Sequence, residues 1–434
     1  MQTQRPAGHV DAVKAYTVST FGRIARAPGW FKNLTGPAQT GQVQAQDALE
    51  GRSTPTMPVV RISALANTPG DKASVTLFDT LKGSPIMGNR NLEGNEQSLE
   101  SSSQDIRLDE MGQGVDAGKR MDQKRIVTEL LPMAESALAG WFPKAYNQLA
   151  LIHVAGSRGT RTGGDWVIPL ASDANFDRIA VNRILAPSYN RHLVIDGPGF
   201  AGNNGAGLGS IDSGDVWTLD HIDYLALLLN VLDVPLQPVI IPGDRAAMDK
   251  PIKAVLFLTP AQMNQFTTQN SGRTWADMVK MAYARKSSMS EPHPLFDGEP
   301  GLWKGILIKE MPVNYVVGWN PGDTTRIVTE ANRYTGTESD QTVNGSLGSS
   351  YQVERALLMG GQALGFLEGG LKSNNYWFEL KRRKYDYDRG NAIGGFTCMG
   401  MQKLRFTPQA ANGQLEPTDH GVIVVDSAVK KISL

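Results

Sequence analysis

Six histidines are the side chains with the widest catalytic and metal-binding repertoire in this sequence. None of them stands near a cysteine or carboxylate at the spacing of a metal site, and no G-x-S-x-G nucleophile elbow occurs. We therefore expect no catalytic site, no metal and no cofactor, with each histidine structural or facing solvent. The six are His9, His153, His192, His221, His293 and His420.

Two other groups could suggest catalysis. Asp220 and Asp223 flank His221, but all three follow Thr218, a good N-cap, and acids in the first turn of a helix are favoured by its dipole. Cys398, the one cysteine, lies in the strand-like run GGFTCMGM, where a small buried hydrophobic residue is the simpler interpretation. Neither group indicates an enzyme.

Two further motifs could bind phosphate or bases. The glycine-rich tract at 197–210 has no G-x-G-x-x-G opening a helix and no following G-K-[ST], so it predicts a flexible loop. Lysines and arginines at 381–384 stand beside two tyrosines and two aspartates at 385–388. Aromatic rings among basic side chains can stack on nucleic-acid bases, but the nearby aspartates favour inter-subunit or solvated ion pairs.

Composition limits the remaining classes of function. The chain has 434 residues, with 43 basic and 43 acidic side chains, which argues against gripping nucleic acid or an anionic membrane by net charge. A single cysteine excludes an intrachain disulfide framework. We see no signal peptide and no apolar run of about 18 residues, so we expect a soluble protein made in a cytoplasm, with no membrane partner.

A long two-stranded ribbon is predicted over residues 73–111. Apolar and polar side chains alternate in ASVTLFDTL and again in SQDIRLDEM, the period of a strand. A polar, glycine-rich loop separates them, yet it carries Ile86, Met87 and Leu92. An isolated ribbon is marginal in water, so we expect this one to be supported by something outside its own domain.

A long helix and an α/β unit follow. Apolar residues at three- and four-residue steps predict a helix within 125–159, with Pro132 in its first turn and a kink at Pro143. Residues 132–156 would span almost 40 Å, at about 1.5 Å per residue. Helices and strands then alternate over 218–318, with helices beginning behind Thr218 and Thr259.

The two ends of the chain are harder to place. Residues 1 to about 70 are poor in large apolar side chains and predict an extended arm with short helical pieces. Its basic residues favour solvation, with contact to a polyanion as the alternative. After a polar connector, QVERALLMGGQALGFLEGG predicts a helix with glycines for close approach, and strands follow to the C-terminus. The basic residues of the arm are Arg5, Lys14, Arg23, Arg26 and Lys32.

Several stretches between residues 70 and 406 resemble the major capsid proteins of tailed bacteriophages, in the branch of large short-tailed phages. They include LKGSPIMGNRNLEGNEQSLE, HVAGSRG, VERALLMGGQALG and DYDRGNAIGGFTCMGMQKLRF. The resemblance implies an α+β, Hong Kong 97-like fold in seven parts. These are an N-terminal arm (1–72), an extended β-hairpin loop (73–119), a peripheral domain with a spine helix (120–217), an axial α/β domain (218–331), a polar connector (332–349), the completion of the peripheral domain (350–406) and a C-terminal tail (407–434).

The resemblance also implies a function. Such a protein is structural and not an enzyme. It forms the hexamers and pentamers of an icosahedral head around double-stranded DNA, with scaffolding, portal and decoration proteins as partners. We expect Ile86, Met87 and Leu92, with Glu93, to contact a neighbouring subunit, and the basic arm to face the DNA. The alternatives are a cargo nanocompartment of the same fold and a cytosolic α/β enzyme.

Overall fold

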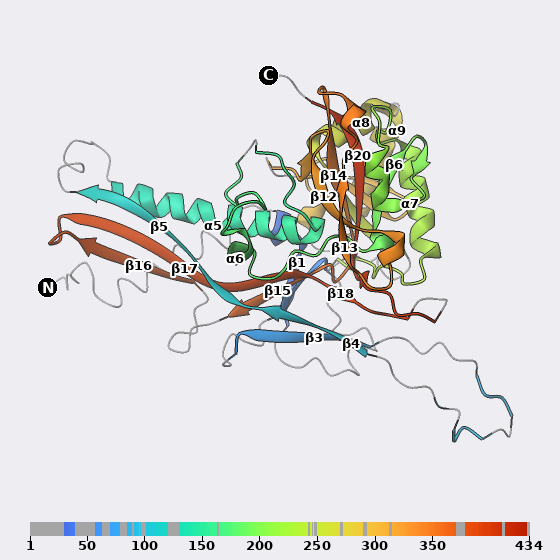
Figure 1. Cartoon of the computed structure of the whole chain (residues 1–434), viewed down its shortest axis with the longest axis horizontal. Helices are drawn as coiled ribbons and strands as arrows, with labels where there is room; N and C mark the ends of the chain where they lie inside the picture. The colour runs from blue at the N-terminus through green and yellow to red at the C-terminus, as the bar shows by residue number, and fades with distance from the viewer. Residues whose placement is uncertain are drawn as a thin grey trace.

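The architecture described here is that of a computed structural model. It describes residues 30–39, 57–62, 70–78, 85–88, 91–94, 96, 101–119, 130–162, 165–241, 244, 246, 250–269, 272–289, 293–311, 315–369, 378–409 and 413–431. Two sheets dominate it, and a long helix joins them (Figure 1).

An eight-stranded sheet forms one end of the molecule. Three helices cover one of its faces: α7 (Leu219–Val231), α8 (Pro260–Gln269) and α9 (Gly272–Ser287). The predicted alternation of helix and strand is confirmed here. The strands, in spatial order, are β7 (Gly199–Phe200), β6 (His192–Asp196), β20 (Val422–Lys430), β14 (Tyr351–Met359), β8 (Ala254–Leu258), β10 (Ile306–Glu310) and β9 (Gly301–Trp303), with β11 (Gly318–Trp319) beside β14.

Both predicted helix caps of this unit are confirmed. Thr218 forms a capping box with His221, whose Nδ1 accepts a hydrogen bond from the backbone N–H of Thr218 at 3.0 Å. Thr259 precedes Pro260 and accepts a hydrogen bond from the N–H of Gln262, and the Gln262 side chain accepts one from Thr259 in return. Each reciprocal pair satisfies N–H groups that the first helical turn leaves free.

A six-stranded sheet carries the long helix α5 (Leu130–Ala155). This helix packs along β17 and β5 and continues through Pro143, at which we expected a kink; Pro132 lies in its first turn as predicted. At about 1.5 Å per residue its 26 residues span close to 40 Å. The strands are β1 (Thr35–Gln39), β2 (Val59–Ile62), β15 (Leu364–Gly369), β17 (Gly390–Lys403) and β16 (Phe378–Tyr385), with β5 (Asp109–Lys119) paired to β17.

The helix predicted from QVERALLMGGQALGFLEGG is wrong, because this segment forms strands β14 and β15. Strand β14 lies between β20 and β8, and side chains on both of its faces are buried, so the apolar–polar alternation of a half-exposed strand is missing. Residues 350–406, predicted as one part of the peripheral domain, are therefore shared between the two sheets.

Three other predicted boundaries also differ from the sheet pairing. The C-terminal segment is no tail, since β20 is an inner strand of the eight-stranded sheet, between β6 and β14. The polar connector at 332–349 contains β13 (Glu338–Thr342), which pairs with β12 (Thr324–Val328). Strands β6 and β7, predicted within 120–217, also join the eight-stranded sheet.

The described part of the N-terminal arm is built into the body of the protein. Helix α2 (Trp30–Leu34) buries Trp30 and Leu34 in the main core, and the backbone N–H of Phe31 donates to the Asn147 side chain of α5 at 3.2 Å. Strands β1 and β2 follow it in the six-stranded sheet. Because large apolar side chains are sparse in this region, sequence reasoning missed how firmly these few anchor it.

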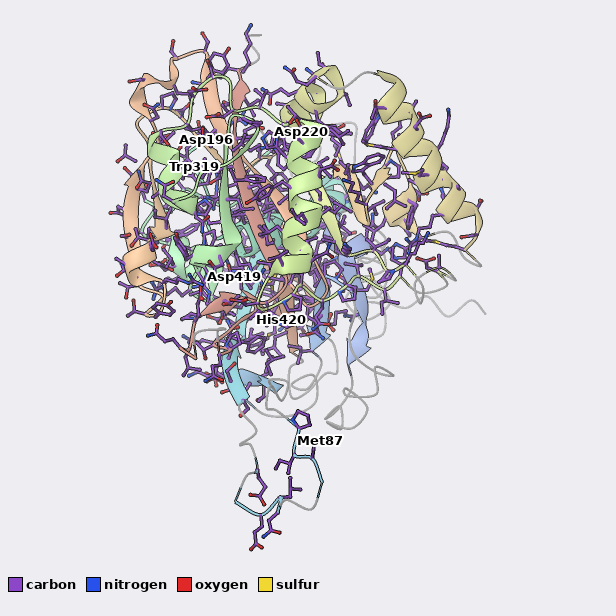
Figure 2. The ribbon with its side chains drawn as sticks, turned by 90° about the vertical axis from the view of Figure 1, so that its right-hand side faces the viewer. Met87, Asp196, Asp220, Trp319, Asp419 and His420 are labelled. Carbon is purple, nitrogen blue, oxygen red and sulfur yellow. The ribbon has the colours of Figure 1, made fainter. Side chains whose placement is uncertain are left out.

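A buried ionic cluster joins the long helix to the eight-stranded sheet. Arg355 donates to Asp426 at 2.7 Å and to the carbonyl of Ala155, the last residue of α5, also at 2.7 Å. Its guanidinium lies 4.5 Å from the ring centre of Trp319 (labelled in Figure 2). Burial favours the neutral acid, but Arg355 and His192 hold the pKa of Asp426 at about 2. The cluster fixes the end of the helix relative to the sheet.

Candidate inter-subunit contact

The predicted ribbon is present. Strands β3 (Lys72–Phe78) and β4 (Ser101–Arg107) pair antiparallel, from Lys72 opposite Arg107 to Phe78 opposite Ser101. The ribbon lies beneath the six-stranded sheet, and the described residues between its strands, 85–88, 91–94 and 96, lie away from the body (Figure 1). Residues 109–119, predicted as part of the extended loop, instead form β5 and pair with β17.

The root of the ribbon packs on its own chain. Ile106 is fully buried in a small cluster, and Val75 and Leu77 pack against the same cluster. Its other buried members are Leu367, Leu404 and Phe406. These three lie outside residues 73–119, so our expectation that the ribbon is supported outside its own domain is confirmed for the root, with the support coming from the same chain; for the tip it stays a prediction.

A buried asparagine clamps the end of the ribbon. The Asn182 side chain accepts a hydrogen bond from the backbone N–H of Arg107 at 2.8 Å and donates to the Arg107 carbonyl at 2.9 Å. It also donates to the carbonyl of Met401, in β17, at 3.1 Å. One side chain thus satisfies both backbone groups of the last ribbon residue and ties them to the sheet.

A second clamp lies three residues earlier in β4, at Gln104. The Gln104 amide donates to the Lys403 carbonyl at 3.0 Å and accepts from the Arg405 N–H at 2.7 Å. The backbones approach so closely that a Cβ at Gly400 would overlap the carbonyl oxygen of Arg107. Sequence reasoning missed Gln104, Asn182 and Gly400, because their partners are remote in the chain and no local pattern marks them.

The tip of the ribbon, in contrast, exposes apolar side chains. Met87 is 74% exposed and Leu92 is 64% exposed, whereas Ile86 is half-buried and Glu93 is exposed. Figure 2 shows Met87 on the loop outside the body of the protein. The tip therefore does not fold back onto its own chain, and its contact with a neighbouring subunit stays a prediction.

Two glycines shape this tip. Gly88 and Gly94 adopt left-handed φ angles of +72° and +83°, which L side chains rarely adopt, and a Cβ at either position would meet nothing within 4 Å. The predicted third glycine, Gly83, lies outside the described residues. A clamped root with a glycine-containing tip can present apolar side chains at a fixed place and still adjust locally.

The structure describes one of the five residues that we predicted to face the DNA. Lys32 is exposed on α2, between the buried anchors Trp30 and Leu34. Arg5, Lys14, Arg23 and Arg26 lie outside the described residues. Contact of this segment with DNA therefore stays a prediction.

The histidines that the structure describes have structural surroundings. His153 donates to the Ala180 carbonyl oxygen at 3.2 Å, and His420 donates to the side-chain amide oxygen of Gln362 at 3.0 Å. Burial lowers the pKa of His153 and of His420 to about 4. Within the described residues, no group of three His, Cys, Asp or Glu side chains could hold a metal ion. No described helix is long and apolar enough to cross a membrane.

The basic cluster at 381–384 forms ion pairs within the chain. Arg382 pairs with Glu135 of α5 at 2.7 Å, and Lys381 pairs with Glu379 at 3.1 Å. The expectation of inter-subunit or solvated pairs is therefore wrong for Arg382, whose partner Glu135 is buried, whereas the Lys381 pair is exposed to solvent, one of the two expected arrangements.

Comparison with known proteins identifies the family. The sequence profile of the phage capsid protein family matches residues 7–431. The chain belongs to this family. A curated relative, the major capsid protein of Pseudomonas phage KPP25, is 28% identical over 362 residues, which cover 82% of this chain and 83% of the relative. The predicted function, that of a phage major capsid protein, is confirmed.

Solved capsid structures share the fold. The capsid of Ralstonia phage GP4 superposes with a TM-score of 0.68 at 19% identity, covering 94% of this chain and 93% of that one. The capsid asymmetric unit of cyanophage Pam1 gives a TM-score of 0.57 at 18% identity, covering 94% and 98%. The predicted Hong Kong 97-like α+β fold is therefore confirmed.

Proposed function

We propose that copies of this chain assemble into the hexamers and pentamers of an icosahedral phage head that encloses double-stranded DNA. The observation that carries the proposal is the extended-loop tip, where Met87 and Leu92 are largely exposed on a loop whose root is clamped. Apolar side chains held away from their own core gain free energy only by burial against another molecule.

The proposed contact is modest and repeated. Burying an apolar side chain of this size contributes about 1.5–3 kcal/mol before ordering costs are subtracted. Many such contacts close a stable shell, while each remains weak enough to break and re-form during assembly. Gly88 and Gly94 allow the tip to meet neighbours in slightly different positions.

The proposal extends to the contents and partners of the head. A formal net charge of zero suits a container that must release its DNA, because phosphate attraction grows with each basic contact. Assembly would take place in the bacterial cytoplasm, with scaffolding, portal and decoration proteins. Cross-linking of residues 1–32 to packaged DNA would support a DNA-facing arm, and an arm protected only by protein would count against it.

The proposal assigns the protein a structural role without catalysis. In support, His153 and His420 are enclosed in the core and His221 serves as part of a helix cap. The family match favours a virus head over the two alternatives, a cargo nanocompartment and an α/β enzyme.

Expression of the chain followed by native mass measurement and negative-stain imaging tests the proposal. We expect closed shells, and nucleic acid inside particles isolated from infected cells. A monomer or small oligomer under all assembly conditions would overturn it, and shells that hold protein cargo and no genome would favour the nanocompartment.

A further inference from the structure

The turn between β16 and β17 holds an exposed aromatic side chain on an unusual backbone. Asp386, Tyr387 and Asp388 adopt left-handed φ angles of 54°, 53° and 64° in succession. Residues with a Cβ rarely adopt this region, so each of the three costs free energy and persists only because its surroundings hold it there. Tyr387 is 98% exposed, more than any other large apolar or aromatic side chain in the described part of the chain.

Ion pairs and hydrogen bonds fix this turn. Lys119, at the end of β5, donates to Asp386 at 2.8 Å, and Arg389 donates to the other carboxylate oxygen of Asp386 at 3.0 Å. These two bonds lower the pKa of Asp386, so its carboxylate stays charged. The Tyr385 hydroxyl donates to Asp116 of β5 at 2.8 Å. The backbone of the turn is thus held in the isolated subunit, which reduces the ordering cost of binding.

The turn and the adjacent strand carry opposite charge. Asp388 is exposed and has no ion pair among the described residues, and the same is true of Arg383 and Lys384 on β16. β16 is an edge strand, where basic side chains also discourage strand pairing. Protection of the sheet edge explains Arg383 and Lys384, but it explains neither the exposed Tyr387 nor the fixed left-handed turn.

This inference rests on the proposed function. We propose that this turn makes a second contact between copies of the chain. Tyr387 and Asp388 of one copy bind the basic flank, Arg383 and Lys384, of the next copy. A tyrosine ring stacks on a guanidinium and a carboxylate pairs with either cation. The occupant is a second copy because the chain itself supplies both the acidic turn and a complementary basic flank.

The geometry of such a contact has a consequence for assembly. In a head-to-tail arrangement, with the turn of each copy on the flank of the next, the contact closes into a ring when the rotation between copies allows it. Figure 1 shows the turn at the free end of β16 and β17, remote from the described tip residues 85–88 and 91–94. One copy would therefore reach its neighbours from two separate ends.

A charge exchange tests the proposal. We expect Asp388→Lys alone, and Arg383→Asp with Lys384→Asp, each to reduce the yield of shells at least tenfold in sedimentation and negative-stain assays. The combination of all three should restore assembly to within about threefold of wild type. Tyr387→Ala should lower the yield, and Tyr387→Phe, which keeps the ring, should not.

The controls separate this inference from the proposed function. All substituted side chains are exposed, so circular dichroism and unfolding of the monomers should match wild type. If wild type forms no shells, the proposed function fails. If wild type forms shells and the variants assemble equally well, or if the combined exchange restores nothing, the second contact is overturned.

Discussion

Asn182 provides a quantitative test of how the extended loop is held. Its side chain makes three hydrogen bonds, two to Arg107 and one to Met401, in a site where it is 7% exposed. A typical bond of this kind contributes about 0.5–1.5 kcal/mol net. Only the two bonds to Arg107 break when the ribbon root opens, so replacement by alanine should lower the free energy of that opening by about 2 kcal/mol.

Hydrogen exchange measured by mass spectrometry reads this change locally. A loss of about 2 kcal/mol raises the exchange rate of amides that open with the root by roughly 30-fold. In unassembled Asn182→Ala subunits, we expect this increase in peptides that cover β3 and β4. Peptides from β8 and β10, in the other sheet, should exchange as in wild type.

Asn190→Ala is the matched control. Asn190 also uses its side-chain amide in a hydrogen bond, to Glu416 at 2.6 Å, but neither residue contributes to the root cluster or its clamps. This variant should leave exchange in β3 and β4 unchanged. Unaltered ribbon exchange in Asn182→Ala, or an equal increase in both variants, would refute the clamp.

Three further predictions concern the packing and the buried charges. Gly400→Ala should destabilise by about 1–3 kcal/mol in denaturant unfolding, because its Cβ would overlap the Arg107 carbonyl, whereas an alanine at the open helical position Gly140 should stabilise slightly. Burial lowers the pKa of His153 to about 4, so the unfolded chain binds a proton on this side chain at a higher pH than the folded chain does. The free energy of unfolding should therefore fall by on the order of 3 kcal/mol between pH 6.5 and pH 4, and His153→Gln should flatten that fall. Arg355→Met should cost about 3–5 kcal/mol in the same unfolding assay, because it leaves the buried Asp426 carboxylate without its guanidinium partner; a loss below 1 kcal/mol would contradict the role of the cluster.

Local sequence patterns predicted the helices and strands that have one apolar and one polar face. The ribbon alternates, α5 has its three- and four-residue steps, and Thr218 and Thr259 are recognisable caps. Strand β14 gave no such signal. Val353 and Leu357 face the main core and Ala356 and Leu358 face the core beneath the helices, so its apolar residues also fit helical spacing. Its position between two strands distant in sequence decides its structure.

The candidate contact was predictable only in part. An apolar group within a polar loop marks Met87 and Leu92 as exceptional, and the structure leaves both exposed. The clamps at Gln104 and Asn182 depend on partners 299 and 75 residues away, which no local pattern reveals. The surface that receives the tip belongs to another copy, so neither one sequence nor one chain specifies it.

Assembly of the variant Ile86→Ser, Met87→Ser, Leu92→Ser tests the central claim most directly. Because Met87 and Leu92 are exposed in the monomer, the variant should fold with the circular dichroism and unfolding of wild type. Electron microscopy, under conditions in which wild type forms shells, should show none from this variant. Normal shells from the folded variant would contradict the claim that the extended loop joins one subunit to the next.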